Sequence, residues 1–330
     1  MKTKSKFPTV IYPLTLTAVV AILAVVGYLN RQSISDWIIL RNYKAPAAIS
    51  TLANQDGMTA YTRKVFYVNH PNLYSRSSFS NYCPNNSEQS VVLGCYHLGQ
   101  NGIFLLSVNS SDLYGIEQVT AAYETLHAIY QRLSPDQQKT LNNELISFEN
   151  HGLNDPIVKA QIAGFRKTEP GGVLNEMTSL FGTEVQNLPP ALNIFYSKYF
   201  SNRQTLLNYY SNYQSAFTTR QQQITSADSQ LSTLKSQITT NEGQLNTQLS
   251  QISYQQTTLN SEKSAGEINQ YNSGVDSYNQ QVDDYNSLAN TTTTLISQYN
   301  QVVDDRNSVV LEEQQLVQDI TAAPKSITNQ

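Results

Sequence analysis

The sequence predicts a mostly helical α+β protein built from three successive parts: a membrane-spanning helix, a compact mixed domain and a long helical hairpin. Three observations predict this organisation. An uncharged apolar run lies near the N-terminus. Short β-type segments, separated by a turn signal, occur in the middle of the chain. Residues 191–323 contain no proline, and an apolar residue recurs at every seventh position within this stretch.

The apolar run predicts a transmembrane anchor within residues 1–30, of which the first few form a cytoplasmic tip. No charged residue occurs in residues 7–30, and residues 9–28 are numerous enough to cross about 30 Å of hydrocarbon as a helix. A cleaved signal peptide is the alternative. Its apolar region is normally shorter and ends at a small-residue cleavage site, which the sequence after Gly27 matches only weakly. We therefore expect an uncleaved, single-pass anchor.

The two cysteines indicate on which side of the membrane the chain lies. Basic residues flank the apolar run on both sides, so charge alone does not orient it. Cys83 and Cys95 are close enough in sequence to form one disulfide, which requires an oxidising compartment and would stabilise the fold by about 2–3 kcal/mol. Two unpaired, buried thiols are the alternative. We expect the bulk of the chain to be extracytoplasmic.

The middle of the chain predicts a linker followed by a compact domain. Residues 31–61 are expected to form a juxtamembrane helix and linker, and residues 62–203 the domain. Two β-type segments, residues 91–93 and 103–108, flank an Asn-Gly step that favours a hairpin. Helices are expected after Gly115 and after the Ser-Pro step that follows Leu133.

Residues 204–320 predict a coiled-coil hairpin. Apolar residues recur at every seventh position from Tyr210 to Leu259, and a second stripe with alternating three–four spacing begins at Ile268. In one continuous helix, the nine-residue step between Leu259 and Ile268 would turn the second stripe by about 180°. A turn near Gly266 removes this conflict.

Two alternatives to an internal hairpin stay open. A tract this rich in Gln and Asn could be disordered. The tail could also pair with a second copy of the chain and give a homodimer. Residues 321–330 are expected to form a disordered tail.

The charge pattern and motifs exclude several classes of function. The net charge of −4 supplies no basic face, so we expect no nucleic-acid partner. The sequence contains neither a G-x-S-x-G elbow nor a G-x-x-x-x-G-K-[ST] phosphate loop.

One segment of the compact domain could carry chemistry. Glu124 and His127, on a predicted helix, have the spacing of the last four positions of H-E-x-x-H. In that motif two His on one helix face bind zinc and the Glu acts as general base. Tyr123 occupies the position of the first His. An isolated E-x-x-H is a weak signal because it occurs often by chance.

The surrounding sequence resembles a family of membrane-anchored bacterial zincin-like proteins, known mainly from small-genome, candidate-phylum bacteria. In such proteins the motif is a full H-E-x-L-H, and a helical tail is common. The resemblance covers roughly residues 36–215 and rests on an ordered set of segments: residues 92–96, 115–122, 175–176, 181–185, 188–189 and 196–203.

The resemblance implies a zincin-like domain of the gluzincin type. Glu124 then matches the general base, His127 the second zinc ligand and Glu176 the third. Tyr123 departs from the pattern, and a phenol with a pKa near 10 is a poor zinc ligand when neutral. Two good protein ligands remain where catalytic zinc usually has three.

We therefore expect a catalytically impaired metallopeptidase homologue, a pseudoenzyme in which zinc is a doubtful cofactor. It would bind a peptide or protein partner at the cell envelope, through the zincin cleft or the coiled coil. An active zinc peptidase and a structural coiled-coil spacer are the alternatives.

Overall fold

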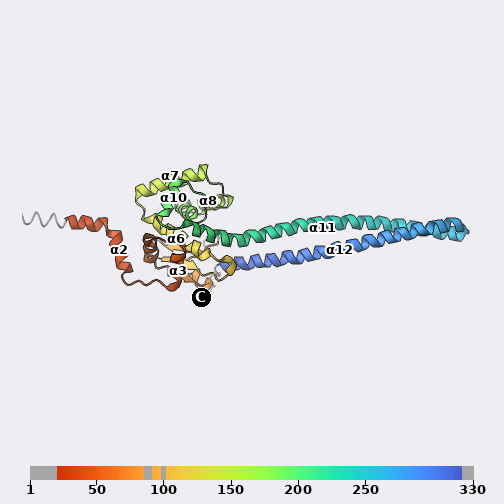
Figure 1. The fold of residues 1–330 in the computed structure, drawn as a ribbon, viewed down its shortest axis with the longest axis horizontal. Coiled ribbons are helices and arrows are strands. Elements are labelled where there is room, and N and C mark those ends of the chain that lie inside the picture. The colour runs from red at the N-terminus through yellow and green to blue at the C-terminus, as the bar shows by residue number, and fades with distance from the viewer. Residues whose placement is uncertain (1–20, 85–90, 98–101, 322–330) are drawn as a thin grey trace, which may run out of the picture. The chain divides into compact units, whose positions relative to one another are not determined.

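The computed structural model describes residues 21–84, 91–97 and 102–321 (Figure 1). Residue contacts divide the chain into two compact units, one comprising residues 1–213 and 319–330, the other residues 214–318. The described residues are mostly helical, as the sequence predicts, with one small sheet.

Most of the predicted anchor lies outside the described residues. Residues 21–29 are helical, and Asn30 separates them from α2 (Arg31–Leu40). Within the part of the chain that is described, no helix has both the length and the hydropathy needed to span a bilayer.

The first unit contains a three-stranded sheet in the order β1–β3–β2. Its strands are β1 (Asn72–Tyr74), β2 (Gly94–His97) and β3 (Gly102–Leu106). β3 pairs antiparallel with β2 and parallel with β1. The antiparallel pair confirms the expected hairpin, although its Asn-Gly turn falls partly among residues not described. β2 begins three residues later than predicted, because the apolar residues 91–93 suggested the strand, whereas glycine at position 94 is depleted in strands.

Helix α6 (Ile116–Arg132) is the central element of this unit. It contacts β2, β3, α3, α4 and α9 (Val173–Thr183), so most of its residues are buried. Gly115 precedes the helix with a φ of 107°, a conformation that favours glycine. The other helices are α3 (Ala47–Gln55), α4 (Ala60–Val68), α5 (Arg76–Phe79), α7 (Pro135–His151), α8 (Pro156–Thr168) and α10 (Pro190–Ser197).

The linker predicted for residues 31–61 differs from the structure. Ile49 and Leu52 of α3 are 1% and 3% exposed and belong to the same core cluster as Leu126 of α6. Met58 forms a β-bridge with Phe200, which fixes the chain between α3 and α4 against the end of the unit. Short helices with few apolar residues gave no clear periodicity, so their burial was not visible in the sequence.

The first residue of α11 (Arg203–Ala265) holds the end of α9. The Nε and Nη2 atoms of Arg203 donate hydrogen bonds of 2.9 and 2.8 Å to the carbonyl oxygens of Gly182 and Phe181. Burial lowers the pKa of Arg203 to about 10. A cation there also complements the negative end of the α9 dipole. The first turns of α11 therefore belong to the compact unit, and the two units divide at residue 213, past the predicted boundary at 203.

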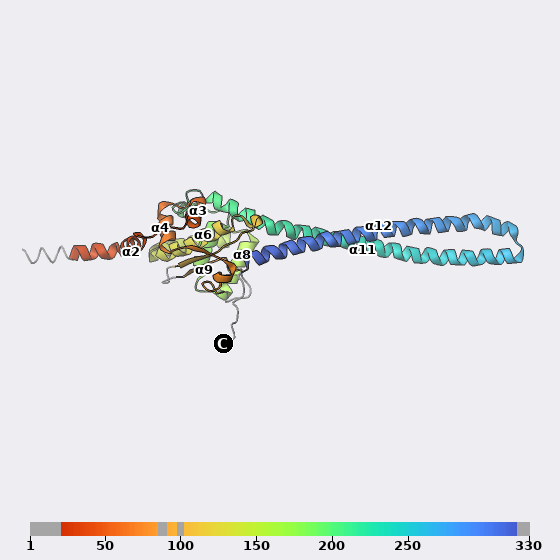
Figure 2. The ribbon, with the colours of Figure 1, turned by 90° about the horizontal axis from the view of Figure 1, so that it is seen from below.

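The second unit consists of most of α11 and of α12 (Ile268–Ile320), which run antiparallel (Figure 2). They are joined at Gly266, whose φ of 76° allows the reversal, and this is the place where the nine-residue step predicted a turn. A Cβ added at Gly274 would lie 2.7 Å from Leu259, so the two helices are close there. Farther along, Arg306 pairs with Asp228 at 2.5 Å.

Candidate functional site

Helices α6 and α9 bring together all four residues that the resemblance singled out. Tyr123, Glu124 and His127 lie on α6, and Glu176 lies in the first turn of α9. The Tyr123 hydroxyl donates a hydrogen bond of 2.6 Å to Oε2 of Glu176. Nε2 of His127 lies 3.6 Å from the same oxygen. The Tyr123 and His127 rings meet edge to face, with centroids 5.0 Å apart.

Close packing between α6 and α9 creates this arrangement. Gly182 of α9 has no side chain, and a Cβ there would collide with Leu126 of α6. Ser179 of α9 donates a hydrogen bond of 2.9 Å to the carbonyl oxygen of Tyr123. These contacts fix the relative rotation of the two helices, so Glu176 faces the Tyr123 and His127 side chains.

Glu124 lies beneath strand β2. A Cβ added at Gly94 of β2 would lie 2.7 Å from Cγ2 of Thr120 and 2.9 Å from Cγ of Glu124. Only a glycine therefore fits this position without displacement. Glu124 is 6% exposed, and burial, followed by the charge of Glu176, raises the pKa of its carboxyl well above the usual range. This environment favours the neutral carboxyl of Glu124 over the ionised form that a general base requires.

The side chain at position 123 is held as a neutral phenol. Burial raises the pKa of Tyr123 well above 10, and the charge and hydrogen bond of Glu176 raise it further. Its proton is directed at the oxygen of Glu176, the atom that would otherwise face a metal. Position 123 therefore supplies a donor where a zinc site needs an electron pair.

The residues present do not fit a catalytic zinc site. Oε2 of Glu176 accepts a hydrogen bond from Tyr123 instead of facing a metal. The other ring nitrogen of His127, Nδ1, is buried and has no hydrogen-bond partner within the described chain. Zinc-binding histidines normally donate that N–H to a carboxylate or carbonyl, which orients the ring. Both the side chains at the ligand positions and the hydrogen bonds that would orient them differ from what zinc requires.

The two cysteines form the expected disulfide. Their sulfurs are bonded to each other, with Cα atoms 5.8 Å apart, and the bridge ties the segment after α5 to β2. His97 lies beside it, with Nε2 3.2 Å from Sγ of Cys95. Bonded sulfurs are not thiolate ligands, so this group of potential ligands is not a metal site while the disulfide is intact.

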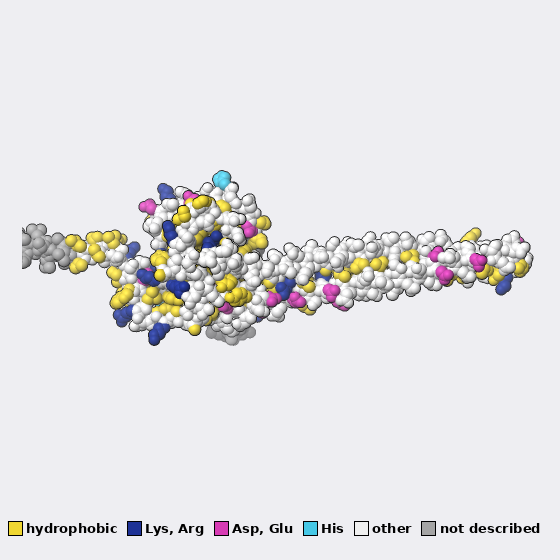
Figure 3. All heavy atoms as spheres, viewed as in Figure 1, with side chains coloured by type: hydrophobic (Ala, Val, Ile, Leu, Met, Phe, Trp, Pro, Cys, Tyr) yellow, Lys and Arg dark blue, Asp and Glu magenta, His cyan; other side chains and the backbone are white. Residues whose placement is uncertain are grey.

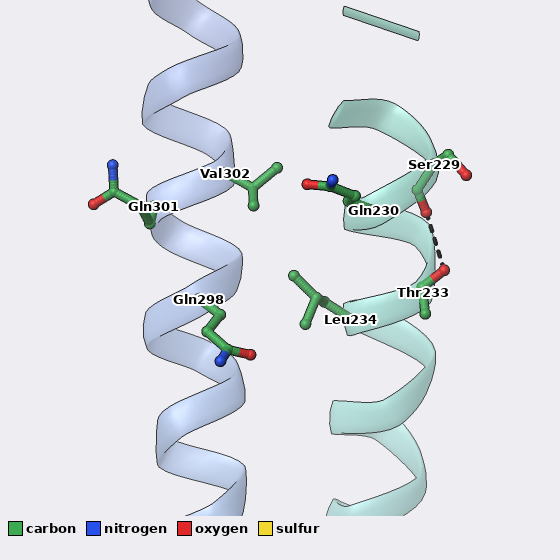
Figure 4. A pocket seen from close by; sticks show the side chains of 7 residues that line it. All are labelled: Ser229, Gln230, Thr233, Leu234, Gln298, Gln301 and Val302. Carbon is green, nitrogen blue, oxygen red and sulfur yellow. Dashed lines mark hydrogen bonds between the residues drawn. The ribbon is translucent and has the colours of Figure 1, made fainter. Parts of the chain in front are cut away.

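The second unit contains a hollow of about 510 Å³ between its two helices (Figure 4). Leu234 of α11 and Val302 of α12 point toward one another across it, and polar side chains surround them. No ionisable side chain lines this hollow. It is a gap in an apolar seam and offers no catalytic group.

Sequence reasoning missed two buried carboxyl groups, Asp36 on α2 and Asp56 after α3, and the half-buried Glu184 after α9. Asp36 is the only acidic residue in residues 1–44, which was a signal that the sequence did contain. For the other two, no motif or spacing marks them as buried.

Comparison with known proteins supplies no relative. The chain matches no protein-family model, and no significantly similar curated protein or solved structure was found.

Proposed function

We propose that the first unit is a zincin-like domain that has lost its metal site and binds a peptide or protein segment without cleaving it, at the outer face of a cell membrane. The observation that carries this proposal is the 2.6 Å hydrogen bond from Tyr123 to Glu176. It joins the two positions at which the resemblance expects zinc ligands, and it directs an O–H group, rather than a free electron pair, at Oε2 of Glu176.

The arrangement around the cluster supports binding. β2 lies at an edge of the sheet and passes directly over Glu124. An extended segment can add to such an edge by backbone hydrogen bonds, which recognise a peptide without any chemical step. The side chains of His127 and Glu176 are mostly buried but keep 10% and 14% of their surface exposed, so polar groups of the cluster remain accessible.

Selection from a displayed peptide library against the full chain in detergent tests this proposal. We expect enriched sequences that bind the wild type, stay intact by mass spectrometry, and fail to bind Gly94→Val, whose side chain displaces β2. Gly164→Ala is the matched control, because nothing lies within 4 Å of a Cβ at that position. Enriched peptides that are cut, or that bind Gly94→Val equally well, would contradict the proposal.

A spacer role is the second candidate, and the length of the second unit favours it. We propose that α11 and α12 form a coiled coil that carries a contact away from the membrane. With 53 residues, α12 spans about 80 Å at about 1.5 Å per residue. Removing residues 238–251 together with residues 281–294 shortens both arms equally. If the function depends on the length of the hairpin, this deletion abolishes partner capture in cells while peptide binding by the purified protein is unchanged. Undiminished capture would contradict it.

A further inference from the structure

Helix α2 is amphipathic in the opposite sense to that of an ordinary surface helix. The side that faces the rest of the first unit carries Asp36, which is 2% exposed. The opposite side carries Ile34, Trp37 and Ile38, which are 46%, 64% and 54% exposed. A helix bathed only in water places its apolar residues toward the core and its charges outward. The outer face of α2 therefore suits an apolar environment.

A buried group of charges holds α2 in this orientation. Nη1 of Arg132, at the end of α6, donates to both Asp36 oxygens at 3.1 and 3.0 Å. Nζ of Lys64 on α4 lies 3.1 Å from Asp36, and Gln32 donates to it at 3.1 Å. Breaking a buried, paired carboxylate away from its partners is costly. The clamp, defined as Asp36 with Arg132 and Lys64, therefore fixes which face of α2 points outward.

We propose that the Ile34–Trp37–Ile38 face of α2 lies in the interfacial region of a lipid bilayer, so that the clamp holds the first unit in one orientation on the membrane. The anchor alone would only tether the domain. This inference rests on the anchor, which is itself proposed, and it is independent of peptide binding.

Two features favour lipid over a protein partner. The outer face continues into residues 21–29, whose large apolar side chains are exposed and gather on this N-terminal segment (Figure 3). Among residues 1–44, Asp36 is the only acid, and it is turned inward, whereas Arg31, Arg41 and Lys44 flank the apolar face. Tryptophan beside basic residues is typical of helices that lie in the headgroup region.

Trp37 reports on this contact directly, because it is the only tryptophan in the chain. The full chain is reconstituted into vesicles of phosphatidylcholine and phosphatidylglycerol, with or without bromine on the upper part of the acyl chains. We expect the Trp37 emission to shift to shorter wavelength and to lose roughly half of its intensity with brominated lipid, because the ring sits at the acyl–headgroup boundary.

Ile34→Ser/Ile38→Ser keeps the reporter and removes the apolar face around it. It should float with the vesicles as the wild type does but lose most of the quenching. Ile157→Ser/Ile194→Ser is the matched control, since both residues are exposed at 47% and 63% on other helices, and it should be quenched like the wild type.

Each other outcome overturns a defined part of the inference. Flotation without quenching of the wild type leaves the anchor standing and refutes the docking of α2. Failure to float refutes both. Equal quenching in Ile34→Ser/Ile38→Ser shows that the anchor alone brings Trp37 to the lipid. A blue shift in detergent that grows with protein concentration assigns the face to a second copy of the chain instead.

Discussion

Replacing Tyr123 by phenylalanine isolates the hydrogen bond on which the proposed function depends. The change removes one oxygen and leaves the ring in place, so packing against His127 is retained. A hydrogen bond to a charged group contributes about 1.5–3 kcal/mol. Glu176 is 14% exposed and can recruit water, so we expect the lower end, about 1.5–2 kcal/mol.

Amide hydrogen exchange of α6 and α9 measures this difference within the first unit. Since 1.4 kcal/mol is a factor of ten in an equilibrium constant, the most protected amides of Tyr123→Phe should exchange about 10–30-fold faster than in the wild type. Tyr130→Phe is the control, because Tyr130 lies on the same helix and donates at 3.0 Å to a neutral acceptor, Asn142. A neutral bond of about 1 kcal/mol predicts about 5-fold. If Tyr123→Phe has no larger effect than Tyr130→Phe, the contact with Glu176 is not the strong one that we describe.

Four further predictions concern the surroundings of the site. Arg132→Met leaves Asp36 buried with one cation fewer and should destabilise the first unit by about 3 kcal/mol or more, seen as faster exchange in α2. Burial opposes ionisation of Asp36, but hydrogen bonds from Arg132 and Gln32 lower its pKa overall. The clamp is therefore intact above about pH 4 and is lost as the pH falls through the pKa of Asp36 in the folded protein. Unchanged hydrogen exchange of α2 in acid would contradict this. Gly94→Val should lower the melting temperature, because the new side chain would collide with Thr120 and Glu124. Gly164→Ala should raise the melting temperature slightly, because nothing lies within 4 Å of the new Cβ and alanine favours the helix. Equal shifts would refute the contact of β2 with α6. Burial raises the pKa of Glu184 to about 7, so its contribution to stability is full below about pH 4.3 and is lost as the pH rises through 7. Glu184→Gln should remove this decline in stability. An unaltered pH profile of unfolding in Glu184→Gln would contradict the prediction.

The features that sequence predicted best depend on local chemistry or on simple periodicity. The disulfide follows from two cysteines at a short separation, and the break at Gly266 follows from the phase of two apolar stripes. The first signal is a short separation in the sequence, and the second is a change of phase in a simple repeat. By contrast, β1 has three residues and no apolar alternation, so it could be recognised only from its parallel pairing with β3.

Long-range contacts account for what the sequence did not predict. The spacing of Glu124 and His127 is local, but the contact between Tyr123 and Glu176 joins residues 53 apart and came from the resemblance alone. Asp36 and Arg132 are 96 residues apart, and nothing in their neighbourhoods links them. The boundary at residue 203 also failed to anticipate that Leu206 packs in the core, because Leu206 belongs to α11, the same helix that continues into the hairpin.

The metal content of the purified full chain, measured beside Tyr123→His after dialysis against zinc and then against zinc-free buffer, tests the central claim most directly. A neutral phenol that donates a hydrogen bond to Glu176 is a poor zinc ligand, so the wild type should retain far less than one zinc per chain. Tyr123→His restores the third ligand and should retain close to one. A wild type that keeps stoichiometric zinc through dialysis would contradict the account.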